Sequence, residues 1–492
     1  MKDKFIWVGR IMPVLALLGL VLAACGDEPK PTSPASTTVA LATTASATST
    51  PVVLLPTVAQ TALAATTAAT TALSNTVAPV TATLPPATPQ PLPTGLPGKI
   101  SIVGNDGQLY LSRLDGKSPQ ILLGQAGVNP VQSGDGQIFA FPTWSKDGKK
   151  LAAISLNIKS GALVTSDVWV VKEDGTSAYK VRDSEPTGGI YLNFSPDGNV
   201  LSMLVGGNGT LELQVADTST GSVAKPSAPR KLLEGQPVYS SWASDNATLL
   251  VHTTDANNDT LNIIDAKNPG GKNQNIPFKP GSFRAPEWSS DGTRFAYVAA
   301  ADSPGKPQAL VISDKAGKEL SRQVGNGEGM SFNWSPDGKQ LAFMSQATTG
   351  DFYDALYLAD VTAATKTKID DGIVLAFFWS PDSRKIAYVT LNPTSNIFTW
   401  IVYDLVSKKS ALLMEWGPSE ATAQILGYSD QYSQSDSIWS PDSKALVFGG
   451  YDKAAILQPQ PGEPQIYILQ VDGTNSGQYY KAGVGELAFW SK

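Results

Sequence analysis

Two residue types that commonly perform catalysis or bind metals are almost missing from this sequence of 492 residues. It contains one cysteine, Cys25, and one histidine, His252. Zinc sites and iron–sulfur clusters need several such ligands, so the sequence excludes both, and no disulfide can form within the chain. His252 lies at the end of the apolar run 249–252, with no serine or cysteine nucleophile nearby in sequence, which favours a histidine packed in the core.

The oxygen-rich segment 255–259 is the one candidate for binding a metal ion. It reads Asp-Ala-Asn-Asn-Asp, and the side-chain oxygens of Asp255, Asn257 and Asp259 are ligands that Ca²⁺ accepts. The segment lacks the downstream glutamate of an EF-hand, and Asn and Asp are also ordinary residues of hairpin turns. A weak calcium site and a plain turn both remain open, and we expect no other cofactor.

Charge and composition divide the chain into two parts. The sequence has 37 lysines and arginines against 43 aspartates and glutamates, a net charge of −6, so we expect no binding to nucleic acid. Residues 29–98 carry a single charge, Lys30, among Thr, Ala, Pro, Ser and Val. Such a composition does not form an ordinary globular surface. We therefore predict a disordered stalk over residues 25–98, with or without O-linked sugar, in front of a folded region at 99–492.

The N-terminus has the features of an export signal. Lys2, Lys4 and Arg10 precede an apolar run over residues 11–24, which is short for a membrane span and typical of a signal peptide. The sequence Leu-Ala-Ala-Cys-Gly at 22–26 resembles the lipobox of bacterial lipoproteins. The resemblance implies that residues 1–24 are removed, that Cys25 carries lipid, and that the protein is anchored to a membrane of the cell envelope, outside the cytoplasm.

A five-residue motif with an aromatic residue first and aspartate fourth recurs at spacings of 45 to 60 residues. Its copies are Trp144–Gly148, Phe194–Gly198, Trp242–Asn246, Trp288–Gly292, Trp334–Gly338, Trp379–Ser383 and Trp439–Ser443. Serine, proline and glycine at the other positions suit a type I turn, and the aspartate can accept hydrogen bonds from nearby amides. Apolar strands follow each copy, so the motif predicts the tip of a hairpin. Spread one per repeat, the aspartates cannot converge on one substrate.

The repeats predict an all-β fold. Each unit contains four antiparallel strands, and a repeat of this length is typical of stacked supersecondary units. Residues 485–492 look like the first strand of another unit, whereas 100–104, 109–114 and 120–123 look like its other three strands. Pairing the two ends would close a ring and remove free sheet edges. We predict an eight-bladed β-propeller over 99–492, with a seven-bladed ring and a separate N-terminal hairpin as the alternative.

The recurring motif resembles the TolB-type propeller repeat, which is also related to WD-like repeats. The resemblance covers about 80% of the chain, and it implies the propeller fold alone. TolB carries an additional α/β domain and no lipid, so its role in the envelope does not transfer. The peptidase relatives carry a hydrolase domain with a Gly-x-Ser-x-Gly motif, which this sequence lacks.

Three long connections are the candidate binding segments: 414–438, 451–464 and 124–142. Loops of this length in a compact domain are commonly functional, although a tolerated surface insertion is the alternative. Aromatic and polar side chains in the first two would suit a protein or a sugar. The candidate binding residues are Trp416, Tyr428, Asp430, Gln431, Tyr432, Tyr451 and Asp452.

These observations predict a monomeric, lipid-anchored, non-catalytic binding or scaffold module for a cell-envelope protein or wall polymer. The alternative is a propeller enzyme of the glycosidase or lyase type with carboxylates in its central funnel, which would leave no local motif in the sequence. A calcium-stabilised stalk head without a dedicated ligand is a further possibility. Two carboxylates about 5 to 10 Å apart beneath the long loops would favour the enzyme.

Overall fold

The computed structural model describes residues 95–491, apart from gaps at 113, 115–117, 186, 207–209, 220–227, 256–257, 269–272, 278, 282–283, 304, 328, 347–351 and 363–364. The predicted signal peptide, Cys25 and the stalk up to residue 94 lie outside the described residues. Among the described residues, no helix is both long and apolar enough to span a membrane.

The described residues form six sheets of four antiparallel strands and one sheet of seven. Three four-stranded sheets contain β1 (Ile100–Val103), β2 (Leu109–Ser112), β3 (Gln120–Leu123) and β31 (Leu487–Trp490); β4 (Gly136–Trp144), β5 (Lys150–Lys159), β6 (Ala162–Lys172) and β7 (Tyr179–Glu185); β8 (Gly189–Phe194), β9 (Val200–Gly206), β10 (Leu211–Asp217) and β11 (Arg230–Gly235). Three more contain β12 (Val238–Trp242), β13 (Thr248–Asp255), β14 (Asn258–Asp265) and β15 (Gln274–Ile276); β16 (Glu287–Trp288), β17 (Arg294–Ala299), β18 (Ala309–Asp314) and β19 (Glu319–Val324); β20 (Met330–Trp334), β21 (Leu341–Gln346), β22 (Tyr353–Ala359) and β23 (Lys366–Asp370).

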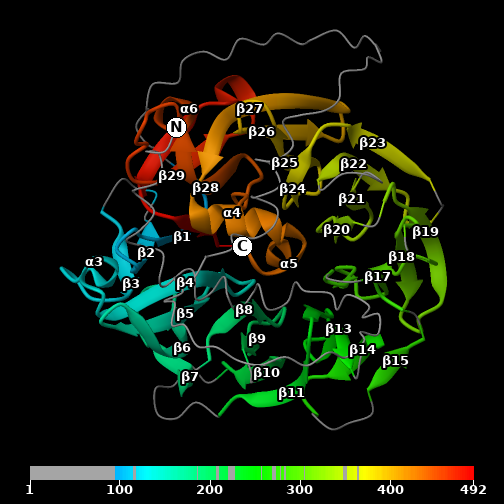
Figure 1. Ribbon diagram of the computed structural model, residues 1–492, viewed down its shortest axis with the longest axis horizontal. Helices are drawn as coiled ribbons and strands as arrows, with labels where there is room; N and C mark the ends of the chain where they lie inside the picture. The colour runs from blue at the N-terminus through cyan, green and yellow to red at the C-terminus, as the bar shows by residue number, and fades with distance from the viewer. Residues whose placement is uncertain are drawn as a thin grey trace, which may run out of the picture. The chain divides into compact units, whose positions relative to one another are not determined.

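The seven-stranded sheet comes last in the chain. It contains β24 (Val374–Trp379), β25 (Lys385–Asn392), β26 (Ile397–Asp404), β27 (Lys409–Pro418), β28 (Ala445–Asp452), β29 (Gln465–Gln470) and β30 (Tyr479–Val484). The short helices are α3 (Pro130–Ser133), α4 (Glu420–Gly427), α5 (Ser429–Ser435), α6 (Lys453–Ile456) and the 3₁₀ turn η1 (Gly473–Asn475). The sheets follow one another around a ring, which confirms the all-β propeller class (Figure 1).

The two ends of the folded region close the ring as the sequence predicts. β31 pairs antiparallel with β1, from Ile100 opposite Trp490 to Val103 opposite Leu487. The four strands of this sheet therefore come from residues about 390 positions apart. Each edge that an open array would expose is paired with the other.

The seven-stranded sheet joins two repeat units. β27 pairs with β28 through only three residue pairs, from Trp416 opposite Asp452 to Pro418 opposite Gly450. Gly450 makes this contact possible, because a Cβ there would lie 2.3 Å from the Gly417 carbonyl oxygen. The inner strand expected around Trp439 is reduced to isolated bridges with Trp490 and Leu446. Dividing the sheet at β27–β28 gives the eight predicted units, whereas the sheets themselves number seven.

The aromatic residue of the motif ties neighbouring units together. Five motif tryptophans donate an indole N–H to the preceding unit: Trp144 to Ser101 Oγ, Trp242 to Asn193 O, Trp334 to Glu287 O, Trp379 to Asn333 O and Trp439 to Phe378 O, at 3.1 to 3.3 Å. Each ring is also almost fully buried. The motif tryptophan therefore supplies apolar contact and a directional bond at the same interface.

The turn of the motif is held by its serine and aspartate. In the copy at 334–338, Ser335 Oγ donates to Asp337 Oδ1 at 2.7 Å, and the Lys339 amide donates to the same oxygen at 3.1 Å. Burial raises the pKa of Asp337, but these hydrogen bonds outweigh burial and leave it below its usual value. The aspartate is thus fixed within its own turn, as the sequence predicts.

Adjacent turns are also connected. Lys150, Arg294 and Lys385 each follow the motif aromatic residue by six positions, and each donates to a turn carbonyl of the next unit. The acceptors are the carbonyls of Gly198, Gly338 and Ser443, at 2.9 to 3.1 Å. In these three units, the basic residue at the same position of the repeat therefore forms a hydrogen bond to the next unit.

Replacing Trp379 by phenylalanine tests the indole bond between units. Trp379 and Trp288 are equally buried, at 8% and 7% exposed, but the Trp288 indole nitrogen has no hydrogen-bond partner among the described residues. Both substitutions remove similar volume. We expect Trp379→Phe to lose about 0.5–1.5 kcal/mol more unfolding free energy than Trp288→Phe, measured by urea denaturation. Equal losses would show that the indole bond adds nothing.

Candidate functional site

The long connection at 414–438 is not a surface loop. β27 extends to Pro418, and α4 and α5 follow it directly. Ser419 caps α4, because its hydroxyl accepts from the Thr422 amide at 3.2 Å. The extra length between the last two motifs is therefore used by a strand extension and a pair of helices.

α5 lies at the centre of the ring (Figure 1). Its Gln431 carbonyl accepts from Tyr191 Oη of β8 at 2.9 Å, and its Asp430 carbonyl accepts from Asn333 Nδ2 of β20 at 3.0 Å. Tyr432 stacks on Phe141 of β4, with ring centroids 5.8 Å apart. These partners belong to three different sheets. Only an element on the ring axis can reach all three, so α5 fills the axis.

α4 anchors this plug to the closing strand. The hydroxyls of Ser419 and Thr422 both donate to the carbonyl oxygen of Glu486, one residue before β31. The Thr422 hydroxyl also accepts from the Gly449 amide of β28 at 3.3 Å. The segment 419–435, called the plug below, is thus bonded to the strands that close the ring.

Burial corrects the interpretation of the candidate binding residues as a loop surface. Trp416 is fully buried, stacked on Trp400 at 5.5 Å and packed on Phe448. Asp430, Gln431 and Tyr432 are 5–6% exposed. These four side chains serve the core and the plug and form no surface in this structure.

Two of the other three candidates lie closer to solvent. Tyr428, between α4 and α5, and Tyr451, on β28, are half-buried. Asp452 is 8% exposed and caps α6 by accepting from the Ala455 amide at 2.9 Å. A binding role for Tyr428 and Tyr451 stays a prediction.

A polar network that the sequence did not reveal includes Asp430 of the plug: Asp430 and His252 are buried, whereas Arg284 and Tyr353 are half-buried. Burial raises the pKa of Asp430, while the nearby Arg284 guanidinium acts in the opposite direction. Arg284 also donates to Tyr353 Oη, and its carbonyl lies 3.0 Å from His252 Nδ1. His252 is 1% exposed, and burial lowers its pKa, so the prediction of a core histidine is confirmed. No local pattern marks Arg284, which comes from a connection between β15 and β16.

Glu420, the first residue of α4, acts electrostatically on Glu486. Burial and, second, the charge of Glu420 raise the pKa of Glu486 to about 7. Burial also raises the pKa of Glu420. Glu486, Glu420 and Glu463 together help to raise the pKa of Tyr451 to about 12, after burial as the largest cause. All three glutamates therefore lie near enough to Tyr451 for their charges to act on its pKa.

The predicted calcium segment is only partly within the described residues. Asn257 and the side chain of Asp255 lie outside them. Asp259 Oδ1 accepts from the Thr254 hydroxyl at 2.6 Å, a bond typical of a hairpin turn. Over the described parts of 95–491, no group of three or more His, Cys, Asp or Glu residues is placed to hold a metal ion.

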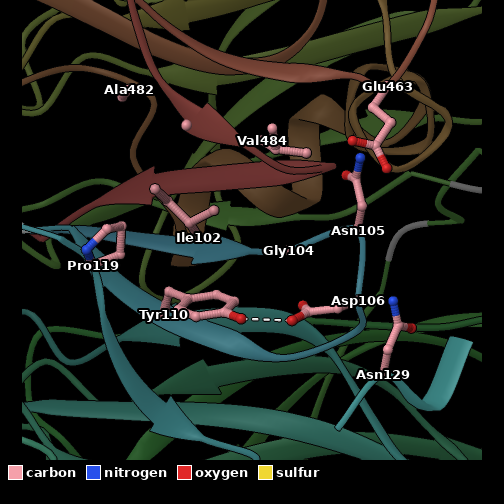
Figure 2. Close-up of a pocket in the computed structure, with 11 residues that line it drawn as sticks. Ile102, Gly104, Asn105, Asp106, Tyr110, Pro119, Asn129, Glu463, Ala482 and Val484 are labelled. Atoms are coloured by element: carbon pink, nitrogen blue, oxygen red, sulfur yellow. Dashed lines mark hydrogen bonds between the residues drawn. The ribbon is translucent and has the colours of Figure 1, made fainter. Parts of the chain in front are cut away.

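A pocket of about 290 Å³ lies between the β1–β2 hairpin and β30 (Figure 2). Its polar lining comes from Asn105, Asp106, Tyr110, Asn129 and Glu463. Asn129 belongs to the predicted connection 124–142, and Glu463 to the connection 451–464. The other three, in and after the turn that links β1 to β2, were missed; a short hairpin turn gives no sign in the sequence that it borders a cavity.

The pocket wall is held by a tyrosine–aspartate pair. Tyr110 Oη donates to Asp106 Oδ2 at 2.5 Å, and the Gln108 amide donates to Asp106 Oδ1 at 3.1 Å (Figure 2). Burial, then the bond to Asp106, raises the pKa of Tyr110 to about 12. A Cβ at Gly104 would lie 2.6 Å from Asp106 and 2.8 Å from Tyr110, so glycine lets this pair form.

Comparison with known proteins concerns the fold alone. No protein-family model matches the sequence, and no curated protein matches it. Among solved structures, the chain is similar to a prolyl endopeptidase (TM-score 0.49, 10% identity, 70% of this chain and 49% of that one). It is also similar to TolB from Acinetobacter baumannii (TM-score 0.38, 13% identity, 78% of each chain). A third similar structure is the β-propeller domain of the Trilobed protease from Pyrococcus furiosus (TM-score 0.43, 13% identity, 71% of this chain and 98% of that one).

The chain spans about half the length of the prolyl endopeptidase. At these identities and TM-scores, no statement about activity or ligand follows from the similarities. TolB and other propellers are what this fold is similar to, and the propeller assignment itself rests on the sheet topology.

Replacing Trp416 by alanine separates a core role from a binding role. Because Trp416 is fully buried among aromatic rings, we expect Trp416→Ala to lower the unfolding free energy by about 3–5 kcal/mol. The control is Leu412→Ala on the same strand, where the side chain is 45% exposed and the expected change is within about 0.5 kcal/mol. Unchanged unfolding of Trp416→Ala in urea would contradict the core role.

Proposed function

We propose that this protein is a lipid-anchored, extracytoplasmic propeller that binds a cell-envelope protein or wall polymer without catalysing a reaction on it. The supporting observation is the plug: α5 occupies the ring axis and bonds to strands on several sides. A propeller enzyme with carboxylates in its funnel needs that axis open to substrate. Here the axial carboxylate Asp430 is buried and faces Arg284.

Recognition is then left to the faces of the ring. The turns β1–β2 and β28–β29 emerge on the face that carries the pocket, as do the connections β3–β4 and β30–β31. This face also carries the glutamates around Tyr451. The opposite face carries the motif turns, whose polar groups bond to one another. We assign ligand binding to the pocket face.

The membrane anchor rests on the lipobox at 22–26. Export of the full chain in a bacterial host should attach labelled palmitate to the wild type and none to Cys25→Ala. The variant should also leave the membrane fraction for the soluble extracytoplasmic fraction. Labelling of Cys25→Ala, or retention of both forms in the cytoplasm, would contradict the assigned location.

Binding is tested with the full-length lipoprotein in detergent. We expect it to co-sediment with purified wall polymer, or to cross-link to one defined envelope protein, without releasing reducing ends or peptides. Heat-unfolded protein is the control for non-specific adsorption. A folded protein that neither sediments with polymer nor forms a defined cross-link would contradict the binding function.

The glutamate pair favours a second candidate, a glycosidase or lyase acting on the pocket face. A carboxyl with a pKa near 7 beside another carboxylate is the arrangement that general acid catalysis uses in glycoside cleavage. Release of reducing ends by the wild type that Glu486→Gln abolishes would support the enzyme. In that case the non-catalytic proposal fails.

Glu486→Gln also has an expected effect on stability. Burial raises the pKa of Glu486 in the folded protein to about 7, so its contribution to stability is present below the unfolded value near 4.5 and is lost as the pH rises through 7. The neutral amide avoids this loss. We therefore expect the unfolding free energy of Glu486→Gln, relative to that of the wild type, to increase as the pH rises from 5 to 8. Urea titrations at each pH measure this difference. The exposed Glu463→Gln is the control, and parallel pH curves for wild type and Glu486→Gln would contradict the burial argument.

A further inference from the structure

We propose that the pocket between the β1–β2 hairpin and β30 binds a neutral saccharide unit, such as a hexose or an N-acetylated hexosamine. The inference rests on the proposed binding function and names its ligand class. At about 290 Å³ the pocket is near the lower end of small-molecule sites, which span roughly 300–1,000 Å³. A space of this size suits one unit of a glycan chain and not a folded partner.

The polar lining offers both donors and acceptors. Tyr110 gives its proton to Asp106, so its phenolic oxygen is left to accept a hydrogen bond. Asn129 Oδ1 accepts from the Gln132 amide, which leaves the Asn129 amide nitrogen as the donor. Sugar hydroxyls both donate and accept, so they can satisfy groups of both kinds.

One lining atom lacks a partner. Asn105 Oδ1 is buried and has no hydrogen-bond partner among the described residues. In Figure 2 the amide end of Asn105 and the carboxylate of Glu463 point toward one another at the edge of the pocket. Leaving a buried acceptor unpaired costs free energy, and a hydroxyl in the pocket would supply the missing donor.

The remaining lining is apolar. Ile102, Pro119, Ala482 and Val484 line the pocket with the ring of Tyr110. Val484 is 45% exposed, so part of its side chain is accessible at the pocket. A sugar ring has apolar C–H faces as well as hydroxyl edges, so this division of the walls matches its two kinds of surface.

The charges that line the pocket restrict the class of saccharide that can bind. Among the described residues that line the pocket, the charged side chains are the carboxylates Asp106 and Glu463, and none is basic. Glu420 and Glu486 add negative charge on the same face around Tyr451. Uronic acids and phosphorylated sugars would be repelled, whereas neutral hexoses and N-acetylated sugars would not.

The position of the pocket gives the proposal a second readout. Val484 belongs to β30, and Ile102 and Tyr110 belong to β1 and β2, so a bound ligand would bridge the two ends of the ring. A ligand that binds only the closed ring stabilises it by mass action. Binding should therefore raise the melting temperature as well as give a binding signal.

The test uses the full-length protein in a detergent without sugar head groups. The probes are cellobiose, the disaccharide of N-acetylglucosamine, the disaccharide of galacturonic acid (digalacturonate) and a lysine-containing tripeptide. Binding is measured by saturation-transfer NMR and by thermal melting. We expect binding and a raised melting temperature with one or both of the first two probes only. Val484→Arg, which places a long side chain at the pocket mouth, should weaken that binding at least tenfold.

Matched variants separate the pocket from general damage. Val406→Arg adds the same side chain at a 66% exposed valine outside the pocket lining and should leave binding unchanged. Tyr110→Phe removes the hydroxyl that bonds to Asp106, and Tyr388→Phe removes a similar bond to Asp370 in another sheet. We expect about three- to tenfold weaker binding for Tyr110→Phe alone.

Several outcomes would overturn the proposal. These are no signal from either neutral disaccharide with folded wild type, binding that survives Val484→Arg, or binding of the digalacturonate or tripeptide alone. If the protein still co-sediments with wall polymer in those cases, the pocket assignment fails and the binding function stands. If co-sedimentation and cross-linking fail as well, both proposals fall.

Discussion

The pairing of β31 with β1 is the constraint on which the ring depends. All other neighbouring strands in a sheet are joined by short turns or follow in the chain, whereas this pair joins residues about 390 positions apart. Without it, the first sheet would lose its inner strand and the last one would face an open edge. Indole bonds and turn-to-turn bonds then repeat around the ring, but they can hold units in place only once the circle is closed.

The plug satisfies a second constraint, which is that the space along the ring axis must be filled. A ring of this many sheets points its inner strands at a centre that their own side chains do not fill, and protein interiors are close-packed. α5 supplies the missing contacts with Tyr432, which stacks on Phe141 and meets Tyr191 edge-on at 5.5 Å. Two of its carbonyls, those of Gln431 and Asp430, accept hydrogen bonds from Tyr191 and Asn333. The insertion between the last two motifs, which the sequence suggests is a surface loop, is thus part of the core in the folded protein.

Periodic features were predictable and the site was not. The repeated motif predicted the all-β class and the role of the turn aspartates, because the same turn chemistry recurs in every unit. The incomplete repeats at the two ends of the folded region predicted the closing pair of strands. Trp416 and Tyr432 were misread, because an aromatic residue in a long connection has the same local pattern whether it packs inward or outward. The pocket was missed for a different reason: Glu463 meets Tyr110 and Asn129 only through ring closure, which joins segments with no shared pattern.

Four adjacent residues connect these features. Val484 lines the pocket, Gly485 follows, Glu486 belongs to the carboxylate pair and accepts the plug hydroxyls through its carbonyl, and Leu487 begins the closing strand. A Cβ at Gly485 would lie 2.8 Å from the Val103 carbonyl oxygen, so the chain passes here with no room to spare. Movement of Val484 would therefore be transmitted to Glu486 and to the start of β31, which are two and three residues further along the chain. A ligand in the pocket acts on the same short segment that closes the ring and holds the plug, which is why its binding and the stability of the whole propeller must change together.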